Sequence, residues 1–126
     1  MGLDQYAFSV KNKAVINRFQ YDYDYTHKEF LGLGKNRFLH NWMEELYQSL
    51  GGIDEFNMKD VQVLPEDIDK LEEDTKSGKI KEYDKGGFFF GEQPFEYQEY
   101  ESIISFCKIA REEFKNDNAV FYCSWY

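Results

Sequence analysis

The strongest periodic pattern in the chain lies between residues 35 and 52. Apolar side chains recur there at steps of three and four residues, at Phe38, Leu39, Trp42, Met43, Leu46 and Leu50. This spacing places them in one stripe along an α-helix, because the helix repeats every 3.6 residues. Asn36 is suited to cap the first turn, and Gly51-Gly52 favours an end by allowing left-handed backbone. We therefore expect a helix from residue 36 to residue 50.

The remaining elements follow from alternating and helical patterns. Strands are expected at 3–10, 14–23, 58–64, 79–84 and 119–126, and further helices at 65–77 and 95–115. The first two strands should form a hairpin, and the last should be central because it carries rings on both faces. This order predicts an α+β fold. One compact domain over residues 1–126 would contain a mostly antiparallel sheet with about three helices packed on it.

Composition narrows the classes of function. Of 126 residues, 42% are hydrophobic and 19% aromatic, and the formal net charge is −9. So many rings favour a folded domain over disorder. The negative charge argues against direct binding of nucleic acid, which needs dense Lys and Arg. Because the chain shows neither an apolar run of membrane-spanning length nor a secretory leader, we expect a cytoplasmic protein with no membrane contact.

Motifs that would carry catalysis are incomplete. G-L-G-K-N at 32–36 resembles a phosphate-binding loop, but the Walker pattern needs Ser or Thr where Asn36 stands. Cys107 and Cys123 share no metal-ligand spacing with each other or with the histidines, so we expect no metal and no cofactor. Both thiols should be buried and reduced. The sequence therefore favours a binding protein over an enzyme.

A basic and aromatic cluster lies at the start of the helix at 36–50, in an otherwise acidic chain. Its cationic, imidazole and amide groups could fix an anion, and nearby rings could stack on a base. The candidate ligand-binding residues are Lys35, Arg37, His40, Asn41 and Trp42, with Phe88, Phe90 and Tyr122 as stacking partners. The alternative is a core helix whose polar side chains form a solvated face.

A second candidate surface is acidic. Residues 66–74 contain six acids against one lysine, and more acids occur at 92–101. Such a face could dock another protein or imitate nucleic acid, although a run of charges is more often a solvated face. Exposed tyrosines could also support a homo-oligomer, because tyrosine is enriched at interfaces.

Five segments, in order along the chain, resemble a family of small proteins found mainly in bacteriophages. They are M-G-L-D-Q-Y-A at 1–7, L-H-N-W-M at 39–43, F-N at 56–57, G-F-F-F-G at 87–91 and Y-C-S-W-Y at 122–126. Two segments depart from the family pattern. G-L-G-K-N-R-F stands where members often have a Tyr-Trp-Arg-Lys run, and C-S-W-Y replaces the usual D-S-W-W end.

The resemblance implies a phage accessory protein that blunts a host defence in the host cytoplasm. Members are often labelled phosphoglycerate kinase, but one small domain cannot supply the two large domains that close over that enzyme's substrates. We expect the protein to sequester a small anionic, nucleotide-like ligand through the basic and aromatic cluster. The alternative is an acidic inhibitor, or nucleic-acid mimic, that binds a host defence protein.

Overall fold

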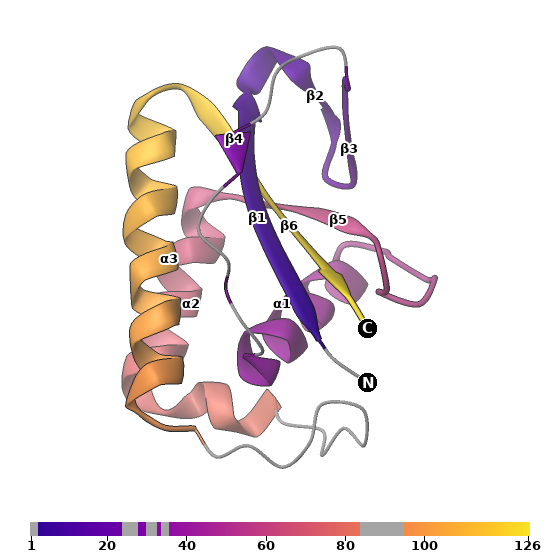
Figure 1. Ribbon diagram of the computed structural model, residues 1–126. Helices are drawn as coiled ribbons and strands as arrows, with labels where there is room; N and C mark the ends of the chain where they lie inside the picture. Colours follow the sequence, from indigo (N-terminus) through magenta and orange to yellow (C-terminus); the bar gives the residue numbers. More distant parts are fainter. Residues whose placement is uncertain (1–2, 24–27, 30–32, 34–35, 84–94) are drawn as a thin grey trace.

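The computed structural model describes residues 3–23, 28–29, 33, 36–83 and 95–126. Within these ranges it confirms an α+β fold, with a four-stranded antiparallel sheet in the order β4-β1-β6-β5 and a separate hairpin of β2 and β3 (Figure 1). The strands are β1 (Asp4–Lys11), β2 (Val15–Asn17), β3 (Gln20–Tyr21), β4 (Lys28–Glu29), β5 (Asp60–Val63) and β6 (Asn118–Trp125). The α-helices are α1 (Arg37–Ser49), α2 (Pro65–Ser77) and α3 (Tyr97–Lys115), and two 3-10 helices span Asn12–Ala14 and Lys79–Tyr83.

The first and last strands of the chain pair along their whole length at the centre of the sheet. Eight residue pairs run from Asp4 opposite Trp125 to Lys11 opposite Asn118. On the outer side of β6 lies β5, and the short β4 lies on the outer side of β1. The central position of β6 confirms the prediction made from its rings on both faces.

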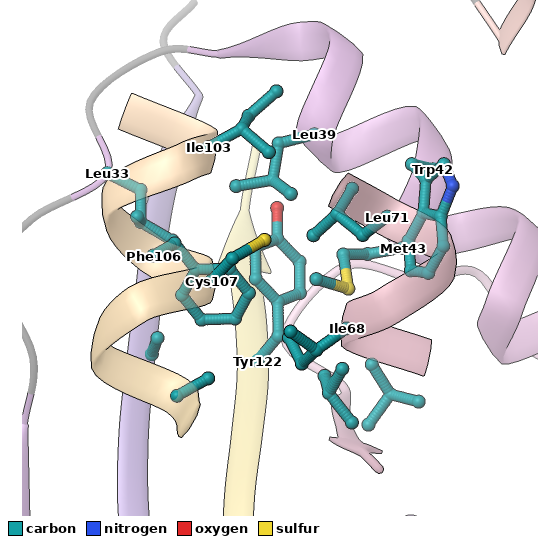
Figure 2. Packing of buried hydrophobic residues seen from close by; sticks show 14 of the residues in the cluster. Leu33, Leu39, Trp42, Met43, Ile68, Leu71, Ile103, Phe106, Cys107 and Tyr122 are labelled. Atoms are coloured by element: carbon teal, nitrogen blue, oxygen red, sulfur yellow. The ribbon is translucent and has the colours of Figure 1, made fainter. Parts of the chain in front are cut away.

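One face of the sheet is covered by all three α-helices (Figure 1). Successive strand residues point to opposite faces, so Ala7, Val61, Val120 and Tyr122 face the helices. Figure 2 shows the Tyr122 ring in the middle of this core, surrounded by side chains of α1, α2 and α3. The predicted apolar stripe of α1 supplies much of this core.

The other face has a smaller core under the β2–β3 hairpin. Phe8 and Val10 of β1 and Phe121 of β6 pack there against Tyr21. The rings of Phe8 and Phe121 are stacked, with centroids 5.7 Å apart. The hairpin reaches one end of this face only, which leaves the end near Tyr6 and Trp125 more exposed.

Both ends of α1 are fixed by the residues expected from the sequence. Asn36 Oδ1 accepts a hydrogen bond from Leu39 N–H at 3.1 Å, which caps the first turn. After the last turn, Gly51 has a φ of 98°, in the left-handed region that glycine tolerates. A Cβ on Gly52 would lie 2.4 Å from the Tyr47 ring, so glycine is also needed there.

Two of the predicted strands are wrong. Residues 14–23 do not pair with β1 but fold back on themselves as the β2–β3 hairpin. Asn17 makes this turn, since its Oδ1 accepts from Phe19 N–H at 2.8 Å and its Nδ2 donates to Gln20 Oε1 at 3.0 Å. The expected edge strand at 79–84 is a 3-10 helix over Lys79–Tyr83, where Ile80 is buried and the segment packs against α1 and α2.

Among the described residues, none of the helices is long and apolar enough to cross a membrane.

Candidate functional site

The polar residues at the start of α1 that the sequence suggested for a ligand cleft are buried. The exposed fractions of Arg37, His40 and Asn41 are 7%, 1% and 3%. His40 Nδ1 lies 2.9 Å from Ser124 Oγ on β6, and the His40 ring packs against Phe56. The first turns of α1 therefore have no solvated face, and their polar groups belong to the interior.

Trp42 points away from His40, toward a buried carboxylate on α2. Asp74 Oδ2 accepts hydrogen bonds from Trp42 Nε1 at 3.0 Å, Lys70 Nζ at 3.0 Å and Tyr83 OH at 3.3 Å. Burial alone would raise the pKa of Asp74. The hydrogen bonds from Trp42 and Lys70 outweigh burial and hold that pKa below its ordinary value of 3.8. The charged Asp74 thus joins α1, α2 and the 3-10 helix Lys79–Tyr83.

Tyr122, suggested as a stacking partner, lies at the centre of the main core (Figure 2). Its hydroxyl donates a hydrogen bond to Gln5 Oε1 on the neighbouring strand β1. Burial raises the pKa of Tyr122 well above its ordinary value, so the phenol stays protonated. The other suggested residues, Lys35, Phe88 and Phe90, lie outside the described residues.

Helix geometry explains why His40 and Trp42 do not face one open cleft. Each residue of an α-helix is rotated by about 100° from the one before it. His40 and Trp42 therefore point to nearly opposite sides, toward Ser124 and Asp74. Arg37 and Asn41, which are one turn apart, do share a face. The Nδ2 atom of Asn41 is buried there, and no residue in the described part of the chain is its hydrogen-bond partner.

The acids of α2 are mostly engaged within the protein. Asp67 Oδ2 accepts a hydrogen bond from Arg18 at 2.6 Å, and Asp69 and Glu72 both bind the guanidinium of Arg111 on α3. The hydrogen bond from Arg111 lowers the pKa of Glu72. The acidic stretch at 66–74 therefore mostly holds α2 against neighbouring elements, which argues against its use as a docking face.

The uncovered end of the sheet holds a pocket of about 260 Å³. Tyr6 and Trp125 form its rim, with exposed fractions of 37% and 51%, and their rings meet edge to face with centroids 6.4 Å apart. We call this pocket the open-end pocket; its lining residues are Tyr6, Phe8, Glu29, Asp60, Cys123 and Trp125.

Strand register places these side chains together. Cys123 of β6 pairs with Tyr6 of β1 on one side and with Asp60 of β5 on the other, so the three lie in a row on one face. Glu29 of β4 is the partner of Phe8. Burial, and then the nearby Asp60, raise the pKa of the Cys123 thiol to about 12. The thiol is therefore protonated at neutral pH and is not an activated nucleophile.

A larger hollow of about 440 Å³ adjoins the open-end pocket and shares Asp60 with it. We call it the hairpin groove; its lining residues are Asn17, Phe19, Gln20, Tyr23, Tyr47, Asp54, Met58, Lys59 and Asp60. Tyr23 and Met58 are 74% and 58% exposed. The two hollows meet at Asp60, and exposed rings, a methionine and carboxylates are among the residues that line them.

This surface is not among the sites suggested from the sequence. The alternation of β1 does place Tyr6 and Phe8 on one face, and that of β6 places Cys123 and Trp125 together. The missing information was that β1 and β6 are neighbours, and that the segment at 14–23 covers only part of their shared face.

Within the described ranges, no group of three or more His, Cys, Asp or Glu residues is placed to hold a metal ion. Comparisons with protein-family models, with curated proteins and with solved structures give no match. The site is therefore interpreted from its own geometry.

The hydrogen bonds to the Asp74 carboxylate should make the stability of the protein depend on pH. Since the pKa of Asp74 is lowered on folding, its contribution to stability is complete above pH 3.8 and is lost as the pH falls through the folded-state pKa. Asp74→Asn should lower the free energy of unfolding at pH 7 by about 1–2 kcal/mol, because charge-assisted hydrogen bonds are lost. The difference from wild type should shrink below pH 3.8, as measured by urea unfolding. The exposed neighbour Glu73→Gln is the control; an equal loss at both pH values would contradict the prediction.

Proposed function

We propose that this protein is a binding protein, not an enzyme, and that it docks a basic and apolar segment of a protein partner on the surface formed by the open-end pocket and the hairpin groove. The observation that carries the proposal is the set of large apolar side chains left exposed around these hollows. Tyr6, Tyr23, Met58 and Trp125 are all at least 37% exposed and line one hollow or the other. Aromatic residues and methionine are the types enriched at protein interfaces.

Charge supports a basic partner. The two hollows contain the carboxylates of Glu29, Asp54 and Asp60. Lys59 is the one cationic side chain among their described lining residues, and its Nζ lies 3.8 Å from Asp54 Oδ2. The whole chain carries a net charge of −9. Opposite charges steer association and disfavour acidic partners. A surface that combines aromatic rings and carboxylates therefore suits a segment in which arginine or lysine alternates with apolar residues.

The proposal corresponds to the acidic inhibitor considered from the sequence, with the docking face moved from α2 to the sheet. The resemblance to small bacteriophage proteins suggests that the partner is a host protein, and that binding blocks it. The buried thiols favour binding over catalysis, since burial raises the pKa of both Cys107 and Cys123 to about 12.

Selection from a library of short random peptides tests the proposal. Immobilised protein should enrich peptides that combine arginine or lysine with aromatic or aliphatic residues. Trp125→Ala should weaken their binding about tenfold or more, because a central exposed ring is the type of residue that dominates interfaces. Binding should also weaken as salt is raised, because exposed charges are screened.

Tyr97→Ala provides the matched control, since Tyr97 is an exposed ring at 74% on α3, in the helical layer. Its loss should leave peptide binding unchanged. Enrichment of peptides without basic residues would contradict the proposal, and so would binding that depends on Tyr97 and not on Trp125.

A second candidate function is capture of a small anionic ligand beside α1. One observation favours it: Asn41 Nδ2 is buried with no hydrogen-bond partner among the described residues, one turn along the helix from Arg37. An oxygen of an anion would satisfy this donor, which is costly to leave unpaired.

Mass spectrometry of small molecules released on denaturation tests this candidate. Protein purified from phage-challenged cells should release a stoichiometric anion, and Arg37→Ala should lose it. Lys115→Ala, at an exposed position on α3, should keep it. Wild-type protein that releases no anion rules the candidate out.

A further inference from the structure

Most of the described residues that line the open-end pocket are aromatic or acidic. Of its described lining residues, three are aromatic, two are acidic and the remaining one is Cys123. Ring faces attract cations through their quadrupole, and carboxylates attract them through their charge. The ring faces and carboxylates of the described lining residues therefore favour a positively charged guest.

The sheet sets these groups around the pocket from four strands. Tyr6 and Phe8 come from β1, Trp125 from β6, Glu29 from β4 and Asp60 from β5. Since β4 and β5 are the two outer strands, their backbones are about 14 Å apart at the usual strand spacing of about 4.8 Å. The carboxylates thus approach from opposite sides, with the rings between them.

The arrangement of the rings also leaves room for a guest. Tyr6 and Trp125 meet at an interplanar angle of 72°, so they do not cover each other as a parallel stack would. Trp125 is 51% exposed, and the pocket beside it measures about 260 Å³. A flat group can enter and lie against a ring while its edges face the carboxylates.

We propose that the open-end pocket is a recognition site for a guanidinium group, supplied by an arginine side chain of the protein partner. This inference rests on the proposed docking function and deepens it. Guanidinium is planar, stacks on aromatic faces and offers a fork of donors to carboxylates. It is also more weakly hydrated than an ammonium group, so it loses less on entering a pocket of rings and a thiol. Arginine is therefore the better guest, and lysine the weaker one.

The two tryptophans allow a direct test. Trp125 lines the pocket, whereas Trp42 is 4% exposed and donates its indole N–H to Asp74. In nitrogen–proton correlation spectra of the labelled protein, L-arginine amide should shift the Trp125 indole signal in a saturable way. The Trp42 indole signal should not move, and it reports in every sample that the fold is intact.

Matched probes and variants sharpen the test. L-Lysine amide should bind several-fold more weakly than L-arginine amide. L-Citrulline amide, which has nearly the same shape and the same α-amino group without the side-chain charge, should cause no saturable shift. Asp60→Asn should weaken arginine amide about threefold to tenfold, as expected for loss of one partly exposed charge partner. Glu73→Gln, an exposed acid on α2, should have no effect.

The outcomes separate this inference from the docking proposal. If arginine amide leaves the Trp125 signal unmoved, or acts no better than citrulline amide, the guanidinium site is overturned; selected peptides that still need Trp125 would leave the docking proposal standing. If arginine amide binds in an Asp60-dependent way but no basic peptide is enriched, the pocket is supported and the docking proposal fails.

Discussion

The pairing of β1 with β6 is the interaction on which the rest of the structure depends. Eight residue pairs join the first strand of the chain to the last, so the two most distant parts of the sequence form the middle of the sheet. The sheet is built on this pair: β4 and β5 extend it, the α-helices cover one face and the β2–β3 hairpin covers part of the other. Because neighbouring residues of a strand point to opposite faces, the same register that places Tyr122 in the main core places Tyr6, Cys123 and Trp125 on the exposed side.

Many polar side chains of the helical layer form hydrogen bonds and ion pairs with one another. Asp74 accepts hydrogen bonds from Trp42, Lys70 and Tyr83. The guanidinium of Arg111 donates hydrogen bonds to Asp69 and Glu72. Buried polar groups need such partners, because an unpaired one costs the desolvation that folding imposed on it. This demand explains why His40 and Trp42, two residues of the basic and aromatic cluster, lie in the interior and contact Ser124 and Asp74. The uncovered end of the sheet is different, since the rings of Tyr6 and Trp125 remain exposed there.

Much of the fold could be predicted from local patterns, and much of the site could not. The periodicity of Phe38 to Leu50, the Asn36 cap and the Gly51-Gly52 end identify α1 because each depends on neighbours within one or two turns. The segment at 14–23 was predicted wrongly, because the Asn17 side chain makes a turn that alternation does not reveal. The open-end pocket depends on residues from four strands, and the pairing of Tyr6 with Cys123 spans nearly the whole chain. Such contacts leave no local trace in the sequence.

We propose that binding uses the uncovered end of the sheet, whereas the start of α1 is part of the core. Hydroxyl-radical footprinting, with and without a selected basic peptide, tests it most directly because the chain offers matched pairs. Trp125 and Met58 are 51% and 58% exposed, whereas Trp42 and Met43 are 4% and 0% exposed. We expect fast oxidation of Trp125 and Met58 in the free protein and protection of Trp125 by the peptide. Trp42 and Met43 should be oxidised slowly both with and without the peptide. Equal oxidation of Trp42 and Trp125, or a bound peptide that protects Trp42 and not Trp125, would contradict it.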